Sequence, residues 1–222
     1  HYTMKLYREE VRPVIDLVMD CSGSMFFEPK KATRSVELFY FLVESASRCG
    51  ASLRTHLVVG DQVRPVPFDA IHNHHWFGTA TDLQSGNPAA PPELDTIQFR
   101  PNAFRVLVSD LLFAGDPAAI IRLLGQRHGS PLLFAPFTHA EANPDWQGNY
   151  EFVDAELGTR HPHRIEPSVL KRFKEAYVNH FSLWKTSSRR YNAILSRVGA
   201  DLDLEAALHD EAVPSAALET TA

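Results

Sequence analysis

The chain has 222 residues, of which 44% are hydrophobic, and a formal net charge of -5 at pH 7. This length and hydrophobic content are typical of a globular protein with one main core. The acidic balance, with no basic stripe, is evidence against nucleic acid as a partner. The short basic run at 187–190 is interpreted as the solvated face of a helix.

The cysteine content and the length of the hydrophobic runs indicate in which cellular compartment the protein is expected. Only Cys21 and Cys49 are present, so a disulfide framework is not expected and a reducing compartment is favoured. No run approaches the roughly 20 apolar residues that are needed to cross a bilayer. We therefore expect a cytoplasmic protein with no membrane segment in this chain, and the alternative is a tether through a region that lies outside it.

Strands and helices alternate along the first part of the chain. Short, β-branched apolar runs predict buried strands, and apolar residues at three- and four-residue steps predict a helix. Asp16 interrupts the first strand, so we expect it near a strand end or paired. The predicted elements in chain order are a strand at 13–19, a helix at 31–49 that ends before Gly50, strands at 52–60 and 62–68, and a strand at 104–110.

The second part continues the alternation with one inserted hairpin. Asp116 and Pro117 form a helix start, because aspartate caps and proline favours the first helical position. We expect a hairpin with its turn at Gly158 and, after it, the longest helix of the chain. The elements predicted here are a helix at 115–127, a strand at 130–138, the hairpin at 149–165, the long helix at 167–198 and a frayed tail at 206–222.

This order predicts an α/β fold with a Rossmann-like, doubly wound and mostly parallel sheet, covered by helices on both faces. In such folds ligands bind at the carboxyl ends of the strands. Asp20 and Asp110 each follow a predicted central strand, so both acids are expected at one edge of the sheet.

The segment "DCSGS" places Asp20, Ser22 and Ser24 in one tight turn. Aspartate and serine are common in turns and caps, so the segment alone is either a capped turn or a site for an electropositive group. It resembles the D-x-S-x-S signature of the metal-ion-dependent adhesion site of von Willebrand factor type A domains. The resemblance implies that Thr81, in "TATDL", and Asp110, in "LVSDLLF", complete the site, and Thr79 is a rival for Thr81.

The remainder of the chain resembles one bacterial branch, the domain-of-unknown-function family fifty-eight. The matching segments are "LYREE", the hairpin turn "DAELG" and the Tyr- and Arg-rich run that ends in "GADLDL". The resemblance implies one VWA-like domain over 1–205, with a metal-site half at 10–140 and the hairpin plus long C-terminal helix at 145–199. It also implies a MoxR-type AAA+ ATPase as a partner class.

The chemistry of these residues suits a hard cation. Mg²⁺ takes about six oxygen ligands near 2.1 Å, and Mn²⁺ or Ca²⁺ also accept oxygen donors. Hydroxyl ligands leave the cation incompletely neutralised, so that an acidic residue of another protein can bind it. We therefore expect a non-enzymatic, divalent-cation-dependent protein-binding module that works with the ATPase in a bacterial cytoplasm.

Three alternatives stay open. Helix breakers after Thr81, where the family usually has a helix, allow a VWA-like scaffold with a degenerate metal site. A metal-dependent phosphohydrolase would use Asp20 as a nucleophile, but the second aspartate of that class is replaced by Ser22. A histidine cluster could hold zinc but lacks thiolate partners, and a loop cluster is the preferred interpretation: His72, His74 and His75. Of Phe26 and Phe27, we expect one in the core.

Overall fold

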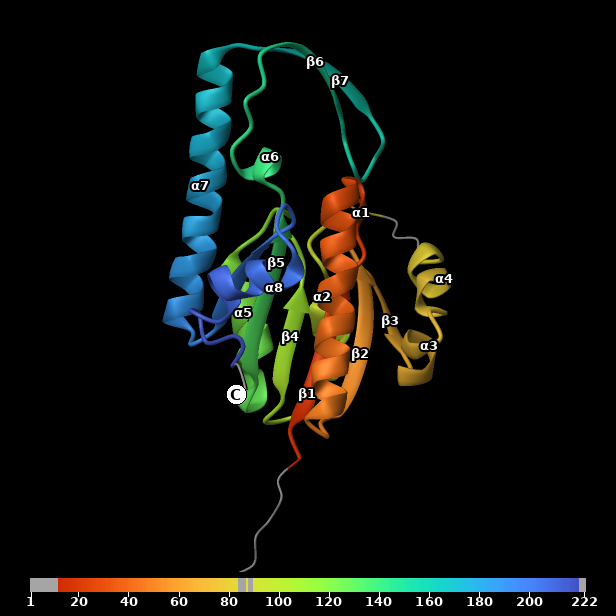
Figure 1. The fold of residues 1–222 in the computed structure, drawn as a ribbon. Helices are drawn as coiled ribbons and strands as arrows, with labels where there is room; N and C mark the ends of the chain where they lie inside the picture. The colour runs from red at the N-terminus through yellow and green to blue at the C-terminus, as the bar shows by residue number, and fades with distance from the viewer. Residues whose placement is uncertain (1–11, 84–86, 88–89, 220–222) are drawn as a thin grey trace, which may run out of the picture.

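Six strands form one sheet in the order β3-β2-β1-β4-β5-β8 in the computed structural model (Figure 1). The structure describes residues 12–83, 87 and 90–219. Neighbouring strands are parallel except β3, which is antiparallel to β2. The strands are β1 Val14–Asp20, β2 Ser52–Val59, β3 Gln62–Val66, β4 Phe104–Val108, β5 Ser130–Phe137 and β8 Ile194–Gly199. This is the strand order of doubly wound folds, and it confirms the predicted fold class.

Helices cover both faces of this sheet (Figure 1). The α-helices are α1 Gly23–Phe26, α2 Pro29–Arg48, α3 Phe68–His72, α4 Trp76–Thr81, α5 Pro117–Gly125, α6 His139–Ala142, α7 Pro167–Arg190 and α8 Leu204–Ala207. Turns of 3-10 helix lie at η1 Leu94–Thr96 and η2 Gln126–His128, and a π-helical turn lies at η3 Leu208–Ala212. No described helix is both long enough and apolar enough to pass through a bilayer.

Two hydrophobic cores lie on the two faces of the sheet. Leu17 and Met19 of β1 pack in the core that contains α2, whereas Val18 packs in the core that contains α5 and α7. Successive side chains of a strand point to opposite faces, so an apolar run is needed where both faces are covered. The apolar run of β1 is therefore explained by burial on both sides.

The helix α2 directly follows the loop after β1. Its start is fixed by the Glu28 side chain, which accepts a hydrogen bond from the Lys31 backbone N–H at 2.8 Å, and by Pro29 at the first position. Its end is followed by Gly50 with φ of 64°, a conformation that favours glycine. The predicted helix and its stop are confirmed.

The acid inside the first strand is paired. Asp16 is 1% exposed and accepts hydrogen bonds from Arg100 Nε at 2.7 Å and from the Arg100 backbone N–H at 2.8 Å. A buried carboxylate needs such compensation because its charge has lost contact with water. The prediction that Asp16 is near a strand end or paired is confirmed by the pairing.

The prediction of one long helix over 167–198 is wrong beyond Arg190. Helix α7 ends there, Asn192 takes a left-handed conformation with φ of 53°, and residues 194–199 form β8, parallel to β5. The helical spacing continued by chance across a break that asparagine supports, because asparagine tolerates positive φ better than most residues.

The tail predicted to fray over 206–222 also needs correction. Residues 204–212 are helical, and Ala207, Leu208 and Ala212 are buried in the core on the α2 side of the sheet. The alanine-rich composition gave no sign of a packed helix face, but small side chains allow the segment to pack closely on the core. Residues 220–222, and the N-terminal motif "LYREE", lie outside the described residues.

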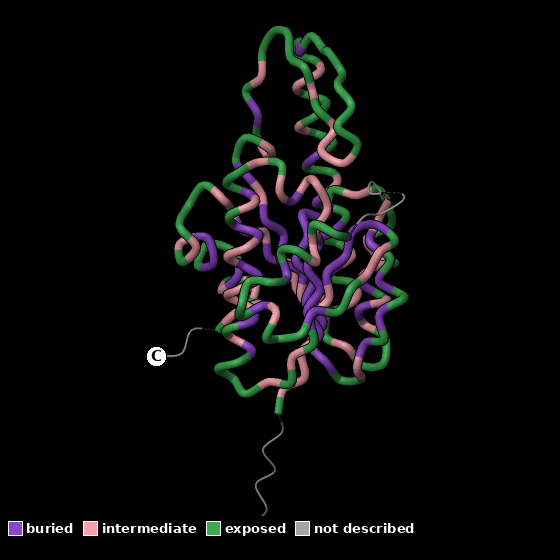
Figure 2. The backbone as a smooth tube through the Cα atoms, turned by 90° about the vertical axis from the view of Figure 1, so that its right-hand side faces the viewer, coloured by how far each residue is buried: buried purple, intermediate pink, exposed green. Residues whose placement is uncertain are grey.

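The predicted hairpin is confirmed and forms a separate two-stranded sheet. Its strands are β6 Gly148–Val153 and β7 Arg160–Ile165, with Gly158 at φ of 67° in the turn. The hairpin is an exposed arm at one end of the molecule (Figure 2). Its tip bends back toward α1 and the end of β1 (Figure 1).

Candidate metal centre

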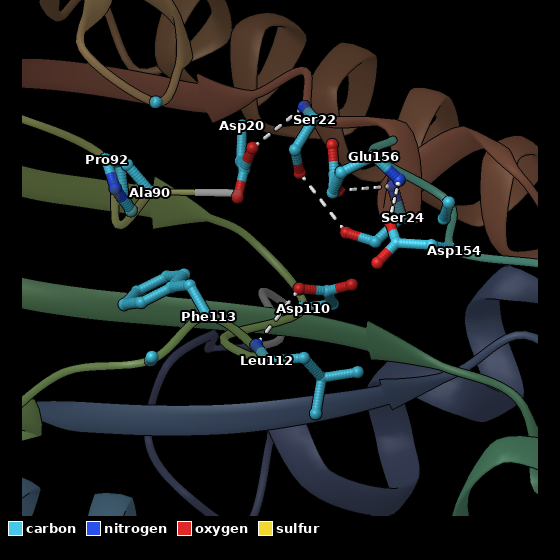
Figure 3. Close-up of a pocket in the computed structure, with 13 residues that line it drawn as sticks. Asp20, Ser22, Ser24, Ala90, Pro92, Asp110, Leu112, Phe113, Asp154 and Glu156 are labelled. Carbon is cyan, nitrogen blue, oxygen red and sulfur yellow. Dashed lines mark hydrogen bonds between the residues drawn. The ribbon is translucent and has the colours of Figure 1, made fainter. Parts of the chain in front are cut away.

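Four of the predicted site residues line one pocket. Asp20 lies at the end of β1, Ser22 and Ser24 follow in the next loop and α1, and Asp110 lies just beyond β4. The pocket has a volume of about 280 Å³, and the side chains enter it from two sides (Figure 3). The parallel order of β1 and β4 brings these distant segments to the same edge of the sheet.

Asp20 is held rigidly at the base of this pocket. It is 3% exposed, and its two carboxylate oxygens accept hydrogen bonds from the Ser22 backbone N–H at 2.9 Å and from Ser109 Oγ at 2.6 Å. Burial, followed by the charge of Asp110, raises the pKa of Asp20 to about 6, although the hydrogen bonds from Ser109 and Ser22 oppose this. The site therefore contains two mutually repelling acids that a bound cation would stabilise.

The two serine hydroxyls face each other. Ser22 Oγ lies 3.3 Å from Ser24 Oγ, and both line the pocket beside Asp20 (Figure 3). The short helix α1 begins at Gly23, and Met25 behind it is fully buried and anchors the turn in the core. The turn is thus fixed on its inner side and presents oxygen atoms on its outer side.

Asp110 is paired with a lysine that sequence reasoning missed. Lys31 Nζ lies 2.7 Å from Asp110 Oδ2 and 2.9 Å from Glu141 Oε2, and the Lys31 side chain is 3% exposed. Burial lowers the pKa of Lys31, but the charges of Asp110 and Glu141 outweigh it, and the net shift is upward. Lys31 therefore carries a positive charge that is buried beside Asp110. Nothing in "PKKA" distinguished it from its exposed neighbour Lys30.

The tip of the hairpin supplies two further acids that sequence reasoning did not assign to the site. Asp154 and Glu156 line the same pocket, on the side of Ser24 (Figure 3). The Glu156 carboxylate accepts hydrogen bonds from the backbone N–H groups of Gly23 and Ser24, each at 2.8 Å. The motif "DAELG" was the only sequence signal for this contact, and its spacing from Ser24 gave no indication of proximity.

The structure does not bring Thr81 into this pocket. Thr81 is the last residue of α4, its hydroxyl donates to the Phe77 carbonyl at 2.8 Å, and it lines a neighbouring pocket instead. Thr79 lies in the same helix and is also absent from the described lining of the metal pocket. The assignment of either threonine as a ligand stays a prediction. Residues 84–86 and 88–89, in the loop after Thr81, lie outside the described residues.

The neighbouring pocket is largely apolar and shares Ser22 with the metal pocket. Phe26 lines it and packs against the core on the α2 side, whereas Phe27 is 60% exposed. Phe26 is half-buried against this core, so the expectation that one of the two phenylalanines is a core residue is met only in part. Phe27 lies at the surface, a few residues after the loop that carries the serines.

The donors that line this candidate pocket suit a hard cation better than zinc. Their donors are carboxylate and hydroxyl oxygens, which Mg²⁺, Mn²⁺ and Ca²⁺ accept. Over the described residues there is no group of three or more His, Cys, Asp and Glu side chains arranged for a metal ion. A cation would therefore depend on Ser22 and Ser24 as well as on the acids. The same absence gives no support for zinc at the histidine cluster, where His74 Nδ1 is hydrogen-bonded to the Tyr40 hydroxyl.

Comparison with solved structures finds likenesses at low sequence identity, and two of them are described here. One is the crystal structure of the conserved hypothetical protein BatB from Bacteroides thetaiotaomicron, with 14% identity and a TM-score of 0.49 over 93% of this chain and 100% of that chain. The other is the crystal structure of an aerotolerance-related membrane protein from Bacteroides fragilis NCTC 9343 with multiple mutations to serines. It has 14% identity and a TM-score of 0.41, over 81% of this chain and 98% of that chain. No protein-family model and no curated protein matches the chain.

Proposed function

We propose that this chain is a VWA-like, non-enzymatic module that binds a protein partner through a divalent cation. The observation that carries the proposal is the shared pocket of Asp20, Ser22, Ser24 and Asp110, whose oxygen donors come from segments some 86 to 90 positions apart in sequence. A capped turn alone would explain the first three residues. It would not explain why a second buried acid faces them from another strand.

In this proposal Asp20 and Asp110 hold the cation from the sheet edge, and the serine hydroxyls hold it from the α1 side. A bound cation would supply positive charge toward an acidic side chain of the partner. Serine hydroxyls carry no formal charge, so the protein ligands leave that positive charge incompletely neutralised. Ser109 and the Ser22 backbone N–H keep the Asp20 carboxylate oriented.

The partner class in this proposal is a MoxR-type AAA+ ATPase in a bacterial cytoplasm. Its support is the sequence resemblance of the "DAELG" hairpin and the run after it to domain-of-unknown-function family fifty-eight. The structure adds that the candidate metal pocket is lined by that same hairpin. The partner would bind at this end of the molecule, beside α1 and the tip of the hairpin.

Metal titration followed by thermal unfolding tests the cation requirement. Mg²⁺ or Mn²⁺ at about 100 times its dissociation constant should stabilise the fold by roughly 2.7 kcal/mol. Asp20→Ala should abolish the shift, and Asp116→Asn should retain it, because Asp116 does not line the pocket and asparagine can cap α5 equally well. Co-purification of the ATPase with the chain, lost on addition of a chelator, tests the partner in the same preparation.

A scaffold with a degenerate metal site is the second candidate. It is favoured by one observation, the Lys31 ammonium that already neutralises Asp110. In that case no divalent ion would raise the melting temperature, and the partner would bind equally well with chelator. Hydrolysis of p-nitrophenyl phosphate that is lost in Asp20→Ala would instead favour the metal-dependent phosphohydrolase.

A further inference from the structure

The contact between the hairpin tip and the serine loop is made by a carboxylate on two adjacent backbone donors. Glu156 Oε2 accepts from the Gly23 N–H and Oε1 from the Ser24 N–H, each at 2.8 Å. Two parallel, charge-assisted hydrogen bonds of this kind fix both the position and the orientation of a carboxylate. The Glu156 side chain is thus seated directly on the loop that carries both serine hydroxyls (Figure 3).

The backbone of the tip also fits the loop closely. A Cβ atom on Gly23 would lie 2.2 Å from the Ala155 carbonyl oxygen, so only glycine allows this approach. Within the tip, Asp154 Oδ1 accepts from the backbone N–H groups of Glu156 and Leu157, each at 2.8 Å. Asp154 therefore stabilises the turn that presents Glu156. Gly23, which faces Ala155 of this turn, leaves room for it because glycine has no side chain.

The arm that carries this tip is not part of the main sheet. Strands β6 and β7 pair only with each other in the described sheets, and all but two of their residues, Phe152 and Ile165, are exposed. The base of the arm is held by an aromatic group in which Trp146 packs against Phe152 and Phe173 of α7. The tip can therefore leave the loop while the base stays packed and the six-stranded sheet stays intact.

From these contacts we propose that Glu156 is an internal competitor that occupies the seat of the partner's acidic side chain, so the hairpin closes the site until a partner carboxylate displaces it. The inference rests on the proposed function for the identity of that ligand. The contact itself does not depend on that function, because the Glu156 carboxylate lines the pocket and accepts from two backbone N–H groups whatever ligand binds there.

The competition follows from the chemistry of the seat. In this proposal a partner glutamate or aspartate would replace the Glu156 carboxylate on the N–H groups of Gly23 and Ser24, next to the proposed cation. Glu156 holds those donors with the same functional group and at a high effective concentration, because it is tethered in the same chain. An external carboxylate must therefore overcome an intramolecular one.

Acetate is a probe of this seat that needs no identified partner. In the Glu156→Ala protein without metal, acetate should produce saturable shifts of the Gly23 and Ser24 amide signals in NMR spectra. The apparent affinity should be at least tenfold higher than in the wild type, where Glu156 fills the seat. Sodium chloride at the same ionic strength controls for general salt effects. Amide hydrogen exchange at Gly23 and Ser24 should also be faster in this variant without acetate.

Two further variants separate competition from a general effect on the fold. Gly23→Ala retains Glu156 but pushes the tip away through the contact with Ala155, so acetate should bind this variant as well. Glu151→Ala removes an acid of the same arm that pairs with Arg160, so it should behave like the wild type. Gly23→Ala can also disturb the loop itself, and for that reason the Glu156→Ala protein is the deciding sample.

The outcomes distinguish the inference from the function on which it rests. Acetate shifts of equal affinity in the wild type and in Glu156→Ala, or none in either, would overturn the inference. A large loss of global stability in Glu156→Ala, with no acetate binding, would show instead that the Glu156 contact only stabilises the fold. If acetate binds the variant but Mg²⁺ does not strengthen that binding at least fivefold, the internal competitor stands and the cation-dependent function fails.

Discussion

Lys31 Nζ lies 2.7 Å from Asp110 Oδ2, and each of these side chains is 3% exposed. The pair places a positive charge inside the protein at the position where the second acid of the candidate site would otherwise be uncompensated. The lysine comes from α2 and the aspartate follows β4, so the pair also joins the first long helix to the sheet edge. The ammonium and a divalent cation would therefore share Asp110.

Replacement of Lys31 by methionine should lower the stability of the metal-free protein and raise its affinity for Mg²⁺. Without metal, the buried charge of Asp110 loses its partner, and the free energy of unfolding should fall by about 3–5 kcal/mol. With Mg²⁺, the affinity should rise at least tenfold, because no ammonium competes for Asp110. Urea unfolding with chelator and calorimetric Mg²⁺ titration measure the two effects.

Lys30→Met is the matched control for that change. Lys30 is adjacent, is 63% exposed and pairs with Asp201. Exposed ion pairs contribute little to stability because water and salt screen them, so this variant should stay close to the wild type in both measurements. An unchanged Mg²⁺ affinity in Lys31→Met would show that Asp110 does not contribute to cation binding.

Asp20→Asn should change how stability depends on pH in metal-free protein. The pKa of Asp20 is raised from 3.8 to about 6, first by burial and then by Asp110, so the folded state holds its proton more tightly than the unfolded state. This group therefore lowers wild-type stability as pH rises from about 4 to about 6, by an amount on the order of 3 kcal/mol above that range. The amide side chain of the variant has no such ionisation, so the variant should lack that decline.

Urea unfolding between pH 4 and pH 8, with chelator present, measures this difference. At pH 7.5 the variant should be as stable as the wild type or more stable, after allowance for one weakened hydrogen bond from Ser109. At pH 4 the advantage should vanish. A constant difference between the two proteins over the whole range would contradict the assigned ionisation.

Thr81→Val should leave the affinity for Mg²⁺ within about twofold of the wild type, since the threonine hydroxyl donates to the Phe77 carbonyl and faces another pocket. Ser22→Ala, in contrast, removes a hydroxyl that lines the metal pocket and should weaken binding clearly. Calorimetric titration of both variants provides the comparison. A loss in Thr81→Val as large as that in Ser22→Ala would show that α4 moves to complete the site.

Arg100→Met should destabilise the fold without any effect on the metal response. Asp16 would keep a buried charge without its ion pair to Arg100, a loss of about 3–5 kcal/mol. The double variant with Asp16→Asn should recover a large part of that loss. The melting shift produced by Mg²⁺ should stay equal to that of the wild type in both variants, because Asp16 lies toward the opposite end of β1 from Asp20.

The parts of the fold that follow from local patterns were predictable from sequence. Burial on both faces makes β1 a largely apolar run up to Asp20, and Pro29, Asp116 and Gly158 act through their own backbone preferences. The boundary between α7 and β8 was not predictable in the same way. Helical spacing continues through it, and only the left-handed conformation of Asn192 ends the helix.

The candidate site was predictable where it depends on strand ends and not where it depends on long-range contacts. Asp20 and Asp110 meet because parallel strands end at one edge. Lys31 reaches Asp110 through the docking of a helix on the sheet, and Glu156 reaches Ser24 through the bend of a hairpin. Neither contact has a periodic sequence signal, because each depends on how separate elements pack in three dimensions.

The segment after β8 has a practical consequence for work with shortened forms of the protein. Glu211 accepts a hydrogen bond from the Arg197 backbone N–H at 3.0 Å, on the outer edge of the last strand, and Leu208 and Ala212 cover apolar side chains beside α2. A chain cut after Gly199 would keep every strand and still leave one sheet border open to pairing with other molecules. Such a truncation should precipitate or self-associate, so a shortened form should retain residues 204–212.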